Sequence, residues 1–318
     1  MKDYRTIFHN CLSVQLEDGV YFPVRFTQKL FQFYKDTGVA QFPARAVQTA
    51  GITLEFLTSD PDIDFDFFFT CFAREWITFD VYENDRFMTT LKFPDHTVKG
   101  HFHYQYHFEE QSKLVIYMPP TADPHFDHFS FDVHPVEAHA KKHMALGCSI
   151  SPGMESIYPS ITYTNIVKRH LHADLLNLGI GGFVYDPGSL DPELPFDPDI
   201  ITVTYGTNDA AGNDTLDVLS RKISAYMKTL KDIYPNKAVN VITPIWRKEY
   251  EEDPAFRLRA DHIRSYIEDA AQAQGFHLID GMAAVPHSES FFKDRFLHPN
   301  DLGFALYGLY VIQNLQLD

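Results

Sequence analysis

Four short segments in the second half of the chain contain residue types that are needed for nucleophilic catalysis. Ser149 follows a short apolar run that ends at Gly147 and Cys148. A serine hydroxyl is a weak nucleophile until a neighbouring base takes its proton. His298 is a candidate for that base, because histidine titrates near neutral pH. Taken singly, Ser149 is better explained as a helix-capping residue and His298 as a surface side chain.

Two further segments offer hydrogen-bond donors. Residues 177–182 read Asn-Leu-Gly-Ile-Gly-Gly, and glycines allow a backbone to approach a ligand closely. Residues 205–209 read Tyr-Gly-Thr-Asn-Asp, in which Asn208 carries a side-chain amide. An acyl-transfer reaction needs such donors where negative charge develops on the carbonyl oxygen. Each segment also has an ordinary explanation, a tight turn for the glycines and a helix cap for Asn208 or Asp209.

The elements that must position these segments follow a βα pattern that begins after Lys142. We predict strands at 144–149, 174–178, 200–205, 238–243 and 276–279, and helices at 160–170, 214–233, 254–274 and 301–313. This alternation predicts a parallel sheet with helices on both faces. Ligands bind such sheets at the carboxyl ends of the strands. Three segments directly follow a predicted strand and the fourth lies beyond the last strand, so we expect all four at one edge.

The first half of the chain has a different pattern. Short strands are predicted at 53–57, 64–71, 76–82 and 113–118, with a short helix near 27–34. Regularly spaced strands predict a β-sandwich or jelly roll, and the 28 phenylalanines suit such sheets. Residues 119–143 read as a boundary loop with a last strand at 129–133. We predict domains at 1–138 and 139–318.

In this order, the four segments resemble the sequence blocks of the SGNH/GDSL hydrolases, over roughly residues 143–316. The resemblance implies a flavodoxin-like three-layer α/β/α domain with strand order 2-1-3-4-5. It implies Ser149 as nucleophile, His298 as base, and an oxyanion hole formed by the Ser149 N–H, the Gly182 N–H and the Asn208 side chain. Residues 45–61 are similar to the jelly roll that precedes the hydrolase in some two-domain members, several of them carbohydrate acetylesterases.

Two positions depart from the family pattern. Cys148 stands where the family usually has Asp or Ser, and we expect Ser149, not Cys148, to be the nucleophile. The triad Asp normally lies three residues before the His, but that residue is Arg295, and Asp294 lies one residue earlier. A one-residue bulge could bring Asp294 to His298, a backbone carbonyl could replace the carboxylate, or the site could be impaired. Of these arrangements we favour Asp294.

These features predict a serine esterase that hydrolyses short acyl esters, acetyl foremost, on a carbohydrate or small glycoside. The alternatives are a short-chain lipase, lysophospholipase or thioesterase, and a non-catalytic carbohydrate-binding protein on a decayed hydrolase scaffold. An α/β-hydrolase is disfavoured, because Ser151 stands where the second glycine of Gly-x-Ser-x-Gly belongs. Trp246 and Arg247 are candidates for the wall of the substrate pocket.

Composition restricts the partners. The net charge of −16 repels phosphates, so we expect neither nucleic acid nor an anionic membrane as partner, but a small-molecule or carbohydrate ester. Three cysteines without a CxxC pair argue against structural zinc and suit a cytoplasmic protein. The first residues have no apolar stretch, so no secretory signal is expected. We expect no cofactor and no metal, with His101, His103 and His107 forming a solvated row. Composition does not indicate the oligomeric state.

Overall fold

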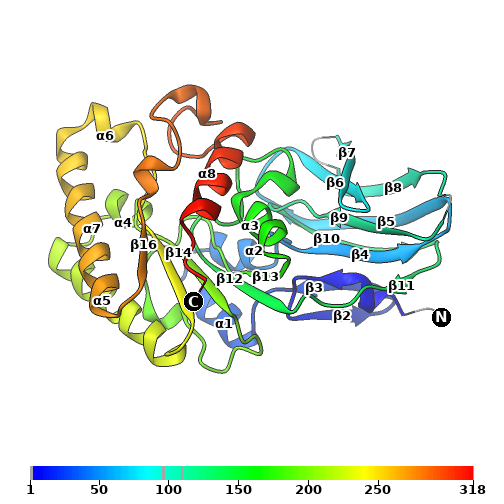
Figure 1. Ribbon diagram of the computed structural model, residues 1–318, viewed down its shortest axis with the longest axis horizontal. Coiled ribbons are helices and arrows are strands. Elements are labelled where there is room, and N and C mark those ends of the chain that lie inside the picture. Colours follow the sequence, from blue (N-terminus) through cyan, green and yellow to red (C-terminus); the bar gives the residue numbers. More distant parts are fainter. Residues whose placement is uncertain (1–2, 95–96, 109, 318) are drawn as a thin grey trace.

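The computed structural model describes residues 3–94, 97–108 and 110–317, and it is elongated, with a β-rich half and an α/β half (Figure 1). The β-rich half contains two antiparallel sheets. The first sheet has the order β1-β4-β9-β6-β7, with β11 also paired to β4; its strands are β1 (Phe8–His9), β4 (Thr53–Thr58), β6 (Ile77–Glu83), β7 (Arg86–Phe93), β9 (Ser112–Tyr117) and β11 (His134–Pro135). The second sheet has the order β2-β3-β10-β5-β8; its strands are β2 (Ser13–Glu17), β3 (Val20–Val24), β5 (Asp62–Phe72), β8 (Lys99–Gln105) and β10 (Ala122–Phe129). The predicted β-sandwich is confirmed.

Aromatic side chains fill the space between the two sheets. Phe65 and Phe67 of β5 point inward because alternate residues of a strand face the same side. The ring of Phe65 stacks on Phe102 of β8 with centroids 4.1 Å apart, and Phe67 contacts Phe79 of β6 at 5.2 Å. Burial of these large rings explains why so many phenylalanines occur in this half.

The segment 119–143 differs from the prediction. It contains β10, which lies between β3 and β5 in the second sheet, whereas residues 130–133 are not in a strand. Pro124 lies inside β10, although proline cannot donate to a strand ladder. The register between β10 and β5 shifts between Ala122 and Pro124, and such an irregularity is where a sheet tolerates proline. Because this segment is rich in proline, we predicted a loop where the structure has strand β10.

The α/β half is a three-layer sandwich. Its parallel sheet has the order β13-β12-β14-β15-β16, which is the 2-1-3-4-5 order implied by the sequence resemblance. The strands are β12 (Lys141–Gly147), β13 (Ala173–Asn177), β14 (Ile200–Thr204), β15 (Ala238–Ile242) and β16 (His277–Ile279). Helices α3 (Tyr163–Leu171) and α8 (Asp301–Asn314) pack together on the side facing the β-sandwich, and α5 (Leu216–Ile233) and α7 (Pro254–Ala273) cover the other face (Figure 1). The short helices are α4 (Thr207–Ala211) and α6 (Glu249–Glu252).

Between β3 and β4 the chain leaves the sandwich and packs against the α/β half. Helices α1 (Gln28–Asp36) and α2 (Gln41–Ala46) form this excursion. Leu30 and Tyr34 of α1 belong to the hydrophobic core that surrounds the parallel sheet. The ring of Tyr34 lies 5.1 Å from that of Phe183, edge to face. The excursion therefore places α2 beside the loop that follows β13.

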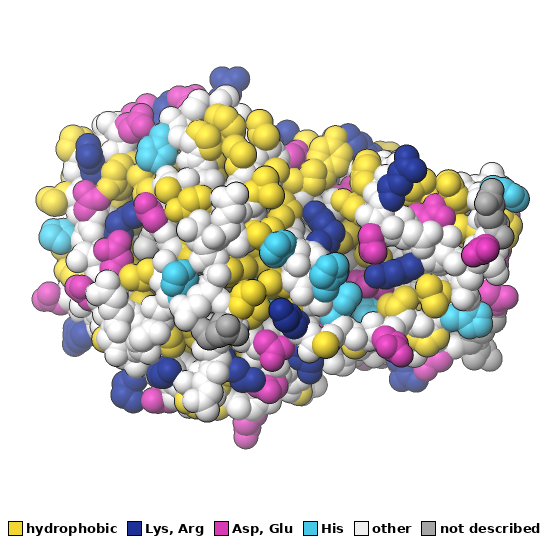
Figure 2. Space-filling model, viewed as in Figure 1, with side chains coloured by type: hydrophobic (Ala, Val, Ile, Leu, Met, Phe, Trp, Pro, Cys, Tyr) yellow, Lys and Arg dark blue, Asp and Glu magenta, His cyan; other side chains and the backbone are white. Residues whose placement is uncertain are grey.

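The surface mixes charges of both signs. On the face shown in Figure 2, acidic and basic side chains are mixed over both halves of the molecule. Within the described residues, no helix combines the length and the apolar character needed to cross a membrane.

A buried ion pair joins the two halves. Lys168 Nζ of α3 lies 2.6 Å from Glu55 Oε1 of β4, and their side chains are 4% and 3% exposed. The Thr53 hydroxyl also donates to Glu55. Burial by itself would raise the pKa of Glu55, but the charges of Lys168 and His9 and these hydrogen bonds outweigh it and hold the pKa far below its usual value.

We expect Lys168→Met to lower the free energy of unfolding by about 3–5 kcal/mol, because Glu55 would remain buried without its partner. The measurement is urea unfolding at pH 7. Lys222→Met is the matched control, because Lys222 pairs with Asp214 at the surface, where such pairs contribute about 0–1 kcal/mol. The folded-state pKa of Glu55 is depressed, so its stabilisation is present above the unfolded pKa of about 4.3 and is lost as the pH falls. Equal losses in the two variants would contradict the prediction.

Candidate active site

Ser149 lies where β12 reaches the carboxyl edge of the parallel sheet. β12 ends at Gly147, and the chain then turns, with the Ser151 N–H donating to the Cys148 carbonyl at 3.2 Å. Gly147 has no room for a side chain, because a Cβ would collide with the hydroxyls of Ser151 and Thr204. The tight turn after this glycine brings Ser149 out of the strand, and Ser149 itself is 3% exposed.

His298 lies directly beside this serine. Ser149 Oγ and His298 Nε2 are 2.8 Å apart, which is within the reach that a general base needs. The side chain of His298 is 18% exposed, so the imidazole lies at the border between protein and solvent. The structure thus brings together two residues from opposite ends of the α/β half.

Asp294 contacts the other nitrogen of the imidazole. Its Oδ2 lies 2.7 Å from His298 Nδ1. The intervening Arg295 has a φ of 57°, in the left-handed region, and the Lys293 N–H donates to the His298 carbonyl at 2.8 Å to close the loop. This left-handed residue absorbs the extra position between Asp294 and His298. Of the three arrangements considered from the sequence, the geometry corresponds to the one in which Asp294 reaches His298.

The loop also holds the Asp294 carboxylate in its charged form. Oδ1 accepts the backbone N–H groups of Phe296, Leu297 and His298 at 2.9, 2.8 and 3.1 Å. Burial would raise the pKa of Asp294, but the hydrogen bonds from His298 and from the loop outweigh it and hold the pKa well below its usual value. A charged Asp294 favours the His298 tautomer that carries its proton on Nδ1, which leaves Nε2 free to accept the Ser149 proton.

Gly182 and Asn208 follow the two strands that flank β12. The Ile180 N–H donates to the Gly147 carbonyl at 2.9 Å, which places the loop of Gly182 against the end of β12. Asn208 lies in the first turn of α4, and its Nδ2 donates to the Phe183 carbonyl at 2.9 Å. An amide carries two N–H groups, so one remains for a ligand. Among the described residues, the Gly182 N–H donates to no protein acceptor.

Two aspartates next to these segments, Asp209 and Asp301, hold them in place. Asp209 is buried and accepts the N–H groups of Gly206 and Tyr185, both at 3.1 Å. Burial raises the pKa of Asp209 to about 6. Asp301 Oδ1 accepts the Ser156 hydroxyl and the Ile157 N–H, both at 2.8 Å, and so ties α8 to the loop after Ser149. In the sequence, only their positions directly after Asn208 and Asn300 could have indicated this supporting role.

Trp246 and Arg247, the candidates for the wall of the substrate pocket, follow β15 at the carboxyl edge of the parallel sheet. Arg247 Nη1 donates to the Thr207 carbonyl at 3.3 Å, immediately before Asn208, and Arg247 is 7% exposed. Trp246 is buried and its indole N–H donates to Glu251 at 3.1 Å. Arg247 therefore supports the start of α4, which carries Asn208, whereas Trp246 ties the chain after β15 to α6.

A group of potential metal ligands lies elsewhere, on the outer face of the second sandwich sheet. One donor atom each of Asp64, His101 and His103 lies within 4.8 Å of the others. Asp64 is opposite His103 and Asp66 is opposite His101 in the β5–β8 register, and each pair forms a cross-strand hydrogen bond. The hydrogen bond to Asp66 outweighs the effect of burial and raises the pKa of His101. These side chains belong to the sandwich and not to the Ser149 site.

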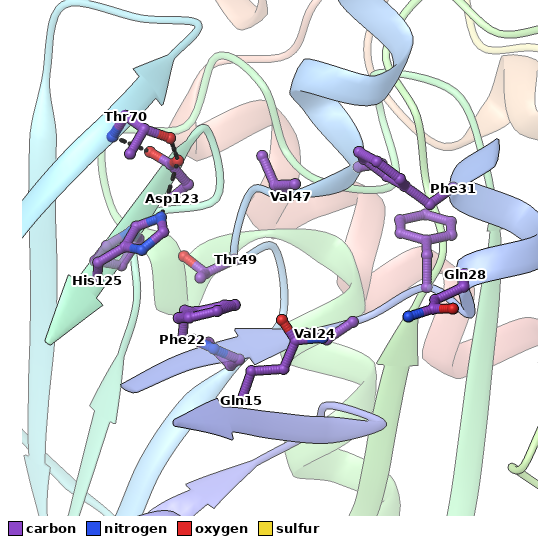
Figure 3. Close-up of a pocket in the computed structure, with 14 residues that line it drawn as sticks. Gln15, Phe22, Val24, Gln28, Phe31, Val47, Thr49, Thr70, Asp123 and His125 are labelled. Atoms are coloured by element: carbon purple, nitrogen blue, oxygen red, sulfur yellow. Dashed lines mark hydrogen bonds and ion pairs between the residues drawn. The ribbon is translucent and has the colours of Figure 1, made fainter. Parts of the chain in front are cut away.

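A cavity of about 340 Å³ opens between the second sandwich sheet and α1 (Figure 3). Its wall is mainly apolar, with Phe22 and Val24 from β3 and Phe31 across from them. At one end Asp123 accepts the Thr70 N–H at 3.0 Å. None of the residues of the four candidate segments lines this cavity, so it is separate from the Ser149 site.

Comparisons with known proteins agree with this architecture. The model of the GDSL-like Lipase/Acylhydrolase family matches residues 145–306, a range that includes Ser149, Gly182, Asn208 and His298. A search of curated proteins found no match.

Solved structures share the fold at low identity. The salicylyl-acyltransferase SsfX3 from a tetracycline biosynthetic pathway is 16% identical, with 96% of this chain and 93% of that chain covered and a TM-score of 0.78. A putative GDSL-like lipase from Bacteroides ovatus ATCC 8483 is 15% identical, with 99% and 97% covered and a TM-score of 0.75. A family two carbohydrate esterase from Clostridium thermocellum is 14% identical, with 84% and 92% covered and a TM-score of 0.63. The chain belongs to the GDSL-like lipase/acylhydrolase family and is a hydrolase of ester bonds.

Proposed function

We propose that this protein is a serine esterase that removes short acyl groups, acetyl foremost, from a carbohydrate or a small glycoside. One observation carries the catalytic part of the proposal. Two hydrogen bonds link Asp294, His298 and Ser149 in a row. Asp294 Oδ2 lies 2.7 Å from His298 Nδ1, and His298 Nε2 lies 2.8 Å from Ser149 Oγ. This is the arrangement that activates a serine hydroxyl.

In the proposed mechanism, Ser149 Oγ attacks the ester carbonyl while His298 Nε2 takes its proton. The negative charge on the carbonyl oxygen is stabilised by the N–H groups of Ser149 and Gly182 and by the free amide N–H of Asn208. His298 then donates the proton to the leaving alcohol. Water attacks the acyl-enzyme with His298 again acting as base, which releases the acid and restores Ser149.

The substrate class rests on the fold neighbours and on the two-domain architecture. The carbohydrate esterase from Clostridium thermocellum was solved in complex with cellohexaose. An acetyl xylan esterase from Butyrivibrio proteoclasticus, 14% identical with a TM-score of 0.56, has a related fold. These likenesses support an acylated carbohydrate as the substrate, and they make acetyl the first acyl group to test.

The proposal is tested with p-nitrophenyl acetate, butyrate and octanoate, followed by acetylated cello- and xylo-oligosaccharides. We expect kcat/KM to be highest for acetate and lowest for octanoate, and acetate to be released from at least one oligosaccharide. A fluorophosphonate probe should label Ser149, as read by mass spectrometry of the peptide. A preference for octanoate would favour a lipase or thioesterase. If the protein hydrolysed none of these esters and Ser149 were not labelled, the esterase proposal would be wrong. A binding protein on a decayed hydrolase scaffold would then be favoured.

A further inference from the structure

The peptide bond between Gly181 and Gly182 forms the centre of a tight turn. The Phe183 N–H donates to the Ile180 carbonyl at 3.1 Å and closes this turn. Gly182 has a φ of 81°, the value of the second central residue of a type II turn. A type I turn differs from type II mainly in a rotation of this central peptide by roughly half a turn. With glycine at both central positions, either orientation is sterically accessible, so a contact outside the turn must select the direction of the Gly182 N–H.

Arg45 makes that contact. It is the last but one residue of α2, and its Nη1 donates to the Gly181 carbonyl oxygen at 2.5 Å. In a planar trans peptide the C=O and N–H groups point in opposite directions. A donor that holds the Gly181 oxygen therefore directs the Gly182 N–H away from Arg45. Gly182 is exposed, and among the described residues its N–H donates to no protein acceptor, so it is free to donate to a ligand.

The end of α2 that carries Arg45 is held against the loop that contains Gly182. Arg25 is 2% exposed, and its Nη2 donates to the Arg45 carbonyl at 3.1 Å while its Nη1 donates to the Asn177 carbonyl at the end of β13. On the side of α2 that faces the turn, Phe42 packs edge to face against Phe183 with centroids 5.2 Å apart. The backbone of α2, which carries Arg45, is thus tied to both ends of the loop that contains Gly182.

The last residue of the same turn, Phe183, holds the second proposed donor. Asn208 Nδ2 donates to the Phe183 carbonyl, one residue after Gly182. The same turn therefore carries both the Gly182 N–H and the carbonyl that anchors the Asn208 amide. A cationic donor on the Gly181 oxygen also polarises the peptide, which strengthens the N–H on its other side as a donor.

We infer that Arg45 is a positioning residue that locks the Gly181–Gly182 peptide with the Gly182 N–H directed into the oxyanion hole. This inference rests on the proposed esterase function. The inference gives the excursion between β3 and β4 a role in catalysis. Arg45, a side chain of the N-terminal half, would orient a donor to the oxygen on which negative charge develops in the transition state.

The test compares Arg45→Met, Arg45→Gln and Arg45→Lys on p-nitrophenyl acetate. We expect Arg45→Met to lower kcat by about 10- to 100-fold with little change in KM, because loosening a donor costs less than the 10²–10³-fold loss seen on removing one. Arg45→Lys keeps a cationic donor and should recover most of the loss. The affinity for a boronic acid that mimics the tetrahedral intermediate should fall in parallel with kcat/KM. Arg45→Gln serves if Arg45→Met does not fold.

Arg169→Met is the matched control. Arg169 donates to the Ser160 carbonyl at 2.6 Å and lies over the rings of Tyr82 and Tyr117, so it too joins the two halves through an arginine, without touching the turn. We expect its kcat to match that of the wild type.

Three results would overturn the inference alone: wild-type kcat in Arg45→Met, a rise in KM with kcat unchanged, or an equal loss in Arg169→Met. A wild type that hydrolyses no ester and is not labelled would instead overturn the proposed function and this inference with it.

Discussion

Ser149→Ala is expected to lower kcat for ester hydrolysis by about 10⁶-fold, the scale on which a serine hydrolase loses activity without its nucleophile. The alanine variant keeps the fold, because the substitution removes from a small side chain only the hydroxyl that is hydrogen-bonded to His298 at 2.8 Å. Steady-state kinetics with p-nitrophenyl acetate give the ratio, and thermal unfolding checks that the variant is folded.

Cys148→Ala is the matched control for that experiment, because Cys148 is the neighbouring residue and the other candidate nucleophile. The thiol is 1% exposed, and burial raises its pKa above the ordinary value, so it stays protonated at neutral pH. A protonated thiol is a poor nucleophile. We therefore expect Cys148→Ala to keep its activity. Activity that survives in Ser149→Ala and disappears in Cys148→Ala would make Cys148 the nucleophile.

Asp294→Asn is expected to lower kcat by about 10⁴-fold at neutral pH, as for the equivalent change in a serine protease triad. An asparagine amide can donate to Nδ1 and so favour the tautomer in which Nε2 carries the proton and cannot accept one from Ser149. The KM should change little, because Asp294 contacts His298 and not the substrate.

The same variant should change the acid dependence of stability. The folded-state pKa of Asp294 is depressed, so its contribution to stability is present above the unfolded pKa of about 3.9 and is lost as the pH falls. The difference in unfolding free energy between wild type and Asp294→Asn should therefore be constant near neutral pH and shrink in acid. Urea unfolding at pH 7, 5 and 3 measures this difference.

Arg295→Gly is the matched control for Asp294→Asn. Arg295 is exposed and has a φ of 57°, a conformation that glycine adopts readily. We expect wild-type kcat in this variant. If Asp294→Asn instead kept full activity, a Ser–His dyad oriented by a backbone carbonyl would explain the site better than a triad.

Much of the α/β half could be predicted from the sequence, because its signals are local. The helix predicted at 214–233 is α5, Leu216–Ile233, whose apolar side chains recur at helical spacing. The strand predicted at 200–205 is β14, Ile200–Thr204, in which every residue is buried. The positions of Ser149 and Asn208 just after such strands were enough to predict that they share one edge of the sheet.

Proline composition misled the prediction where pairing with distant strands decided the structure. Residues 122–129 have a loop-like composition, yet they form β10 between β3 and β5. The strand exists because both neighbours complete its hydrogen bonds and Phe126 fills the sandwich core. No window of sequence around Pro124 contains that information.

The sequence by itself determined the fold class, the order of the βα units and the set of side chains at the carboxyl edge, because hydrophobic periodicity and strand ends are properties of neighbouring residues. Only the tertiary structure decided how these side chains meet. The pairing of Asp294 with His298 depends on a left-handed Arg295, and the orientation of the Gly181–Gly182 peptide depends on Arg45, 136 residues away. The first depends on a local backbone conformation that the residue types alone do not specify. The second depends on a contact between distant segments, which arises only when the two halves pack together.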